Sequence, residues 1–129
     1  MNSCALRVRM RELIWIGSSR RDLKLFPAEV EDEMGYALYF AQQGIRPHHA
    51  KTLSGMGSAK VLEIRESDRS GTYRAVYMVE WEGVVFVLHA FQKKSKSGIA
   101  TTKQDIDLIK QRLKEAEVLY KKLKEEGGL

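Results

Sequence analysis

Short apolar runs separated by polar, glycine-containing breaks predict strands at four places along the chain. Residues 13–16, Leu-Ile-Trp-Ile, are β-prone and stop at Gly17. Three further strand candidates follow one another closely, at residues 61–65, 73–79 and 84–91. Their connections are short, polar and contain glycine, which favours antiparallel hairpins over crossover helices. The sequence therefore predicts an antiparallel meander with one further strand ahead of it.

Helical patterns lie on either side of this meander. After Pro27, which suits the first turn of a helix, apolar residues recur at helical spacing until Gly44. A second, longer helix is predicted to begin at Thr101 or Thr102, because Thr102 and Asp105 have the spacing of a capping box. Its apolar positions alternate three and four apart and form a stripe: Ile106, Ile109, Leu113, Ala116, Tyr120 and Leu123.

That stripe must lie on a surface, either the sheet of the same chain or a partner. Packing on its own sheet is the commoner outcome for an amphipathic helix. The order of elements predicts an α+β fold, with a small antiparallel sheet of about four strands. Helices are expected to pack on one face of the sheet, which leaves the other face at least partly open.

Composition and charge narrow the class of protein. Hydrophobic residues make up 43% and charged residues 30% of the 129, as in a folded domain. No apolar run approaches the roughly 20 residues of a membrane helix, and one cysteine, Cys4, excludes an internal disulfide. These features favour a cytoplasmic protein.

Positive charge is concentrated in one part of the chain. Lys and Arg number 22 against 17 Asp and Glu, which gives a formal charge of +5. Residues 26–43 hold four acids and no base, whereas residues 89–103 hold four bases and no acid: Lys93, Lys94, Lys96 and Lys103. Such a cluster suits a polyanionic partner.

The order of the strands predicts which side chains share a face. Antiparallel partners have residue numbers with a constant sum, so pairing Val79 with Val84 places His89 opposite Arg74. Pairing Arg65 with Arg74 then gives one row of Arg65, Arg74 and His89. Two like charges on neighbouring strands are unfavourable unless an anion lies between them. That anion is either a carboxylate, such as Glu63 or Glu66, or a phosphate, and the nearby lysines favour phosphate.

The order of four short motifs resembles that of a known family. Residues 51–55 (Lys-Thr-Leu-Ser-Gly), 62–65 (Leu-Glu-Ile-Arg), 73–77 (Tyr-Arg-Ala-Val-Tyr) and 88–94 (Leu-His-Ala-Phe-Gln-Lys-Lys) resemble the phage-derived branch of the RelE/HigB toxin superfamily. The likeness spans roughly residues 10–120. It implies a single toxin domain over residues 10–126, with residues 1–9 as an N-terminal extension and Met10 as the natural start.

The resemblance also implies a function and a partner. Members are toxins of two-protein toxin–antitoxin pairs, usually ribosome-dependent endoribonucleases that cut messenger RNA without a metal or other cofactor. The partner is expected to be an antitoxin with a helix-turn-helix DNA-binding fold, bound to the toxin as an oligomer. The family's strand arginine falls on Arg74, and its basic pair falls on Lys93 and Lys94. Glu63 stands where well-studied members carry lysine, and this departure leaves the acid–base assignment open.

Cleavage of this kind uses the ribose 2′-hydroxyl as the nucleophile, and needs a base, an acid and cations. The residues expected to be catalytic are Arg74, His89, Lys93 and Lys94. Those expected to bind phosphate or guide RNA are Arg65, Lys51, Lys60 and Lys96. The adjacent histidines 48 and 49 lack further ligands at metal-binding spacing, and the glycines of residues 54–60 fit neither phosphate-loop template.

Two alternatives to cleavage remain. One is a toxin-fold inhibitor of an enzyme such as gyrase, and the other is an inactive member retained for partner binding. The nuclease hypothesis requires the cations of neighbouring strands to converge on one open patch. The hypothesis would be contradicted if Arg65, Arg74 and the pair Lys93 and Lys94 pointed in unrelated directions, or if they were buried beneath the protein's own helices.

Overall fold

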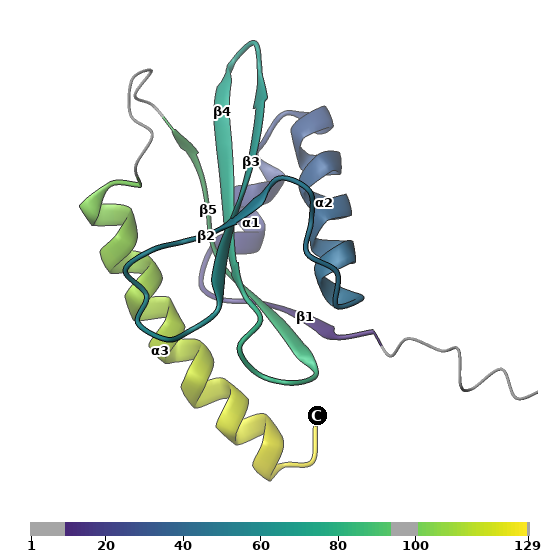
Figure 1. Cartoon of the computed structure of the whole chain (residues 1–129), viewed down its shortest axis with the longest axis vertical. Helices are drawn as coiled ribbons and strands as arrows, with labels where there is room; N and C mark the ends of the chain where they lie inside the picture. The colour runs from purple at the N-terminus through teal and green to yellow at the C-terminus, as the bar shows by residue number, and fades with distance from the viewer. Residues whose placement is uncertain (1–9, 94–100, 129) are drawn as a thin grey trace, which may run out of the picture.

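A five-stranded mixed sheet forms the centre of the computed structural model, which describes residues 10–93 and 101–128 (Figure 1). The strands are β1 (Glu12–Trp15), β2 (Ala50–Thr52), β3 (Val61–Asp68), β4 (Gly71–Met78) and β5 (Val84–Lys93). Their order across the sheet is β1-β5-β4-β3-β2. Strands β2 to β5 pair antiparallel, and β1 pairs parallel with β5. The predicted α+β class and the meander are confirmed, and the short β2 and the parallel β1 complete the sheet.

In the described part of the chain, three helices cover the sheet. Helices α1 (Ser19–Lys24) and α2 (Ala28–Gln42) follow β1, and α3 (Lys103–Glu125) follows β5. Figure 1 shows α2 and α3 on opposite sides of the sheet. Because side chains alternate along a strand, each strand supplies residues to both faces. Leu38 of α2 packs with Tyr77 in one apolar core, while Ile109 and Ala116 of α3 pack with Val76 in a second core.

The expectation that helices cover only one face of the sheet is therefore wrong, although the second face stays partly exposed at Lys51 and Arg65. The stripe along α3 packs on the chain's own sheet, as predicted, but it does so on the face opposite α2. Ile109 and Ala116 are fully buried there. The spacing of a stripe shows that a helix packs on a surface, but it does not show which face of the sheet that surface belongs to.

The predicted start of α3 is confirmed. Thr102 is the N-cap, and its Oγ1 accepts a hydrogen bond from the backbone N–H of Asp105 at 3.2 Å. The Thr102 hydroxyl donates in turn to Asp105 Oδ2 at 2.7 Å. A side chain that satisfies one of the unpaired first-turn N–H groups stabilises a helix start by about 1 kcal/mol. The cap therefore fixes the place at which α3 begins over the sheet.

A β-bulge in β5 decides which way His89 faces. Arg65 lies opposite Arg74, as predicted, but Arg74 lies opposite Phe91, and His89 lies opposite Val76. The predicted direct pairing of His89 with Arg74 is therefore wrong. The register shifts between Val76 and Tyr77, so one extra residue of β5 lies between Val87 and His89. The bulge keeps His89 on the same face as Arg74; without the shift it would point toward α2.

Some features of the sequence lie outside the described residues. These are the expected extension 1–9 with Cys4, and the lysines Lys94 and Lys96. Within the described ranges, no helix has both the length and the apolar character needed to cross a membrane.

Candidate functional site

Two rows of side chains cross the sheet on the face that α3 covers. One row runs from β2 to β5 through Lys51, Glu63, Val76 and His89. The next row holds Arg65, Arg74 and Phe91. Directly paired residues of neighbouring strands share a face, with Cβ atoms about 5 Å apart. The register therefore gathers a carboxylate, an imidazole and three cations on one surface.

Glu63 lies between the two arginines. Its Oε1 is 3.1 Å from Arg65 Nε and 3.1 Å from Arg74 Nη1. The Glu63 and Arg74 side chains are each 3% exposed, whereas the Arg65 side chain is 34% exposed. Of the two anions considered from the sequence, the protein's own carboxylate occupies the position between the opposed guanidiniums. The repulsion between the two arginines is thus compensated by the negative charge of Glu63, which forms a buried ion pair with Arg74.

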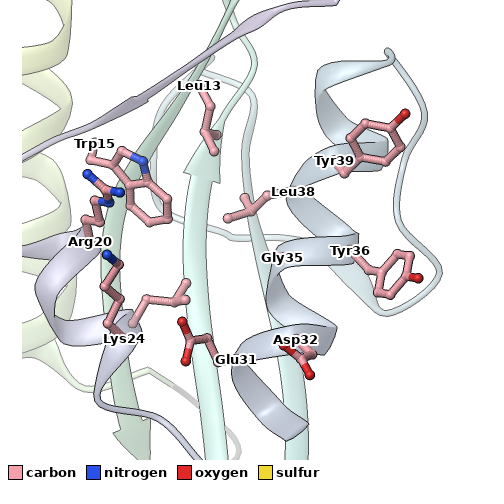
Figure 2. A pocket seen from close by; sticks show the side chains of 11 residues that line it. Leu13, Trp15, Arg20, Lys24, Glu31, Asp32, Gly35, Tyr36, Leu38 and Tyr39 are labelled. Atoms are coloured by element: carbon pink, nitrogen blue, oxygen red, sulfur yellow. The ribbon is translucent and has the colours of Figure 1, made fainter. Parts of the chain in front are cut away.

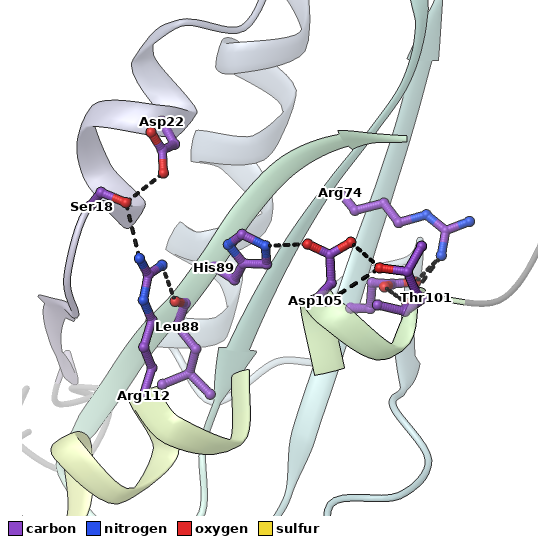
Figure 3. A network of polar contacts seen from close by, with 10 residues as sticks. Ser18, Asp22, Arg74, Leu88, His89, Thr101, Asp105 and Arg112 are labelled. Carbon is purple, nitrogen blue, oxygen red and sulfur yellow. Dashed lines mark hydrogen bonds and ion pairs between the residues drawn. The ribbon is translucent and has the colours of Figure 1, made fainter. Parts of the chain in front are cut away.

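The segment at the start of α3 contacts this ion pair, and Figure 3 shows Thr101 beside Arg74 and Asp105 beside His89. The Thr101 hydroxyl donates to Glu63 Oε2 at 2.8 Å and accepts from Arg74 Nη1 at 3.3 Å. Asp105 Oδ1 lies 2.9 Å from His89 Nε2. The His89 ring also stacks on Phe91, with ring centroids 4.5 Å apart. Thr101 and Asp105, at the start of α3, therefore bind polar side chains from three strands.

We name Glu63, Arg74, His89, Thr101 and Asp105 the closed network. The other nitrogen of His89, Nδ1, is buried and has no hydrogen-bond partner in the part of the chain that the structure describes. Asp105 can hold His89 while capping the helix because each function uses a different oxygen of its carboxylate. A helix cap and a sheet residue are thereby coupled through one side chain.

A second set of contacts holds α3 against the bulge. Arg112 Nη1 donates to the Leu88 carbonyl at 2.9 Å, and Arg112 Nη2 donates to Ser18 Oγ at 3.0 Å (Figure 3). The Ser18 hydroxyl donates to Asp22 Oδ2 at 2.6 Å. Arg112 thus ties the middle of α3 to β5 and to the start of α1.

The expectation of one open cationic patch is wrong for two of its members. Arg74 and His89 share the predicted face, but both are buried beneath the start of α3. The physical reason is that Thr101, just before the N-cap, and Asp105, in the first turn of α3, cover these side chains, and sequence spacing alone did not reveal it. Arg65 is half-buried, and Lys51, opposite Glu63, is exposed.

The remaining predicted residues are divided between two places. Lys93 lies opposite Thr72 at the end of β5 and faces the same way as His89. Lys60 does not join this cluster, because it lines a cavity on the α2 face together with Tyr77. Lys94 and Lys96 lie outside the described residues, so their predicted roles stay predictions.

Three residues of the site were not assigned from the sequence. Glu63 was identified only as a departure from the family pattern, although its place between two arginines was a stated possibility. Thr101 and Asp105 were recognised only as signals for a helix start. Their contacts with the sheet depend on how α3 docks, which no local motif encodes. Among the described residues, no group of three or more His, Cys, Asp or Glu is placed to hold a metal ion.

An apolar groove lies on the other face, between α1, β1 and α2 (Figure 2). Leu13, Trp15 and Leu38 line it. Its charges balance, because Arg20 and Lys24 of α1 are matched by Glu31 and Asp32 of α2. This balance gives the groove no preference for anions.

Comparisons with known proteins support the fold. The structure is similar to that of a free mutant of the Escherichia coli toxin RelE, with a TM-score of 0.54 and 18% sequence identity. That likeness covers 82% of this chain and 97% of RelE. A weaker likeness is to a chain of the RelBE2 toxin–antitoxin complex from Mycobacterium tuberculosis, with a TM-score of 0.43, 20% identity and coverage of 69% and 98%. No curated protein sequence matches the chain significantly.

Family membership follows from the sequence profile. The family described as phage-derived protein Gp49-like (DUF891) matches residues 21–114, which include the strands β2 to β5, the helix α2 and the first half of α3. The profile thus spans well over half of the chain and every residue of the closed network. Together with the RelE-like fold, this match confirms the resemblance noted in the sequence. The chain belongs to the Gp49-like family of phage-derived proteins, and it has the RelE fold.

Proposed function

We propose that this chain is the toxin of a two-protein toxin–antitoxin pair and that it cuts messenger RNA on the ribosome without a metal ion. Family membership and the RelE fold support the toxin assignment, since the structural relative is itself named a toxin. The proposal includes a cytoplasmic location and an antitoxin partner with a helix-turn-helix domain. The chemistry must be argued from the site, because a fold alone does not fix a function.

The observation that carries the nuclease proposal is the grouping of Glu63, Arg74 and His89 on one face of the sheet. Metal-independent cleavage of RNA transfers the 2′-hydroxyl proton to a base while the 2′-oxygen attacks the adjacent phosphorus. The bond to the 5′-oxygen then breaks, and an acid protonates that oxygen. A carboxylate and an imidazole provide the two proton-transfer groups, and guanidiniums stabilise the extra negative charge on the phosphate.

We assign the base to Glu63 and the acid to His89. Glu63 already accepts hydrogen bonds from Arg65, Arg74 and Thr101, so its oxygens lie beside the cations that would hold the phosphate. His89 is two residues along β5 from Phe91, the pairing partner of Arg74. Lys51 and Lys93 flank the rows at the sheet edge and at the end of β5, where they would contact neighbouring phosphates.

Arg74 and His89 are buried beneath the start of α3, an arrangement that counts against cleavage in this form. The proposal therefore requires that the start of α3 leaves the sheet before RNA can reach these groups. Among the described residues, the polar contacts that must break include Thr101 to Glu63, Arg74 to Thr101, and His89 to Asp105. Each of these contacts is a single hydrogen bond or ion pair at the N-terminal end of α3. Breaking all of them therefore costs a few kcal/mol of free energy. The closed network is then the resting form of the site.

Induction of the chain without its partner tests the proposal. We expect growth arrest together with new 5′ ends in cellular transcripts. Substituting His89→Ala or Glu63→Gln should abolish those ends. Arg21→Ala is the matched control, because Arg21 is a 78% exposed arginine on α1. Unchanged transcript cleavage in both site variants would refute the site.

The closed network also favours a second candidate function. Arg74 is 3% exposed and bound to Glu63, as in a purely structural ion pair. A chain with such a site could act as an inhibitor of an enzyme such as gyrase, or be retained only for partner binding. Growth arrest with no new 5′ ends identifies the inhibitor. Absence of both effects identifies the inactive form.

A further inference from the structure

A second cavity lies on the α2 face of the sheet, away from the closed network. Its volume is about 530 Å³, and it lies between the end of α2, the segment before β3, and the strands β3 and β4. Tyr77, Leu62 and Val79 form part of its apolar lining. Volumes of about 300–1,000 Å³ are typical of sites for small molecules. The cavity is therefore large enough for a ligand well beyond a simple ion.

Among the described residues, three cations line this cavity and no acid does. Arg11, Arg46 and Lys60 are among its lining residues, which include no Asp or Glu. None of the three forms an ion pair with a carboxylate within the described ranges. The groove of Figure 2 differs, because there two cations face two acids. The excess positive charge at this cavity makes binding of an anion favourable.

Backbone carbonyls hold two of these cations in place without neutralising them. Arg11 Nη1 donates to the Ala41 carbonyl at 3.5 Å, in the last turn of α2. Arg46 Nε donates to the Ala50 carbonyl at 3.3 Å. Each of these arginines keeps further N–H groups that can bind another acceptor. The guanidiniums are thus positioned but still able to bind an anion.

Tyr77 contributes a buried polar group to the same cavity. The residue is 1% exposed and lines the cavity, and no hydrogen bond joins its hydroxyl to another described residue. Burial raises the pKa of Tyr77 to about 12, while the charge of Arg46 acts to lower it, so the two groups lie close enough to interact. At neutral pH the hydroxyl is protonated and can donate a hydrogen bond.

We propose that this cavity binds a nucleotide, with the phosphate held by Arg11, Arg46 and Lys60 and the base resting on the apolar lining beside Tyr77. The three cations would bind the phosphate oxygens. The apolar lining and the volume suit a flat ring system, which a nucleotide has and a bare phosphate lacks. The nucleotide is either free or the 5′-phosphorylated end of an RNA chain, since both present the same chemistry.

Calorimetric titration of the whole chain with 5′-AMP tests this proposal. We expect 5′-AMP to bind more tightly than adenosine or inorganic phosphate. Arg46→Ala should weaken binding by about tenfold, and Tyr77→Phe should weaken it by a smaller factor while keeping the ring. Arg21→Ala, which changes an exposed arginine outside the cavity, should leave the affinity unchanged.

Further arms of the titration separate the two sources of the ligand. A 5′-phosphorylated trinucleotide that binds better than 5′-AMP identifies the end of an RNA chain, and the reverse order identifies a free nucleotide. Failure of 5′-AMP to bind, equal affinity for inorganic phosphate, or an unaltered affinity in Arg46→Ala would each overturn the proposal. The nuclease proposal is tested separately, because Glu63→Gln and His89→Ala change residues on the opposite face of the sheet.

Discussion

The buried ion pair between Glu63 and Arg74 allows a quantitative prediction. Their side chains are each 3% exposed, and Oε1 and Nη1 are 3.1 Å apart. Removing one partner of a buried pair leaves an uncompensated charge and usually costs about 3–5 kcal/mol. Glu63 keeps its contact with Arg65, so we expect Arg74→Met to lower the free energy of unfolding by about 3 kcal/mol, at the lower end of that range.

The double variant Glu63→Met/Arg74→Met should recover most of that loss. It leaves neither partner's charge buried, and replacing a buried pair with apolar side chains of similar volume is often neutral or stabilising. We therefore expect a free energy of unfolding within about 1 kcal/mol of the original protein, and a coupling energy between the two sites of at least about 3 kcal/mol.

Urea unfolding, followed by the fluorescence of Trp15 and Trp81, measures all four proteins of this cycle. The exposed pair Lys103–Asp107 provides the matched control. Its atoms are 3.3 Å apart, but its side chains are 90% and 59% exposed, so its coupling should be at most about 0.5 kcal/mol. If the effects of Glu63→Met and Arg74→Met simply add, to within about 0.5 kcal/mol, the buried pair does not exist as described.

Three further predictions concern the start of α3 and Tyr77. Thr102→Ala removes the N-cap and should lower the free energy of unfolding by about 1 kcal/mol in the same urea assay; no change would mean that the cap contributes nothing. Asp105→Ala releases His89 and should raise the cleavage of messenger RNA on purified ribosomes, with Thr102→Ala as the control that leaves His89 held; equal rates in the two variants would exclude Asp105 as a latch. Tyr77 should ionise near pH 12 in a near-ultraviolet absorbance titration, and Tyr77→Phe should lack that late step. Because an unfolded chain ionises tyrosine near pH 10, the stability tied to Tyr77 is fully present below pH 10 and is lost as the pH rises to about 12, with a total loss of at most about 3 kcal/mol. A titration in which all tyrosines ionise near pH 10 would contradict the burial of this hydroxyl.

Local patterns in the sequence were enough to predict most of the elements. The hairpin between β3 and β4 has a short turn, so its register follows from the constant sum, and Arg65 lies opposite Arg74 as expected. Thr102 and Asp105 form the capping hydrogen bonds that their spacing predicted. Both successes depend on residues within a few positions of one another.

Features that depend on distant parts of the chain could not be predicted. The parallel pairing of β1 with β5 joins residues about seventy positions apart. The bulge near Leu88 has no glycine or other local signal, yet it determines the face of His89. Likewise, α3 could have packed on either face of the sheet. Its actual position converts an expected open cationic patch into the closed network.

The central claim is that Glu63, Arg74 and His89 cut RNA once the start of α3 moves away. Mapping transcript 5′ ends after induction of Glu63→Met/Arg74→Met tests it most directly, because this variant is expected to fold normally while lacking two of the three groups. The account predicts no new 5′ ends from this folded double variant and abundant new ends from the original chain. The same set of cuts from both proteins would contradict it.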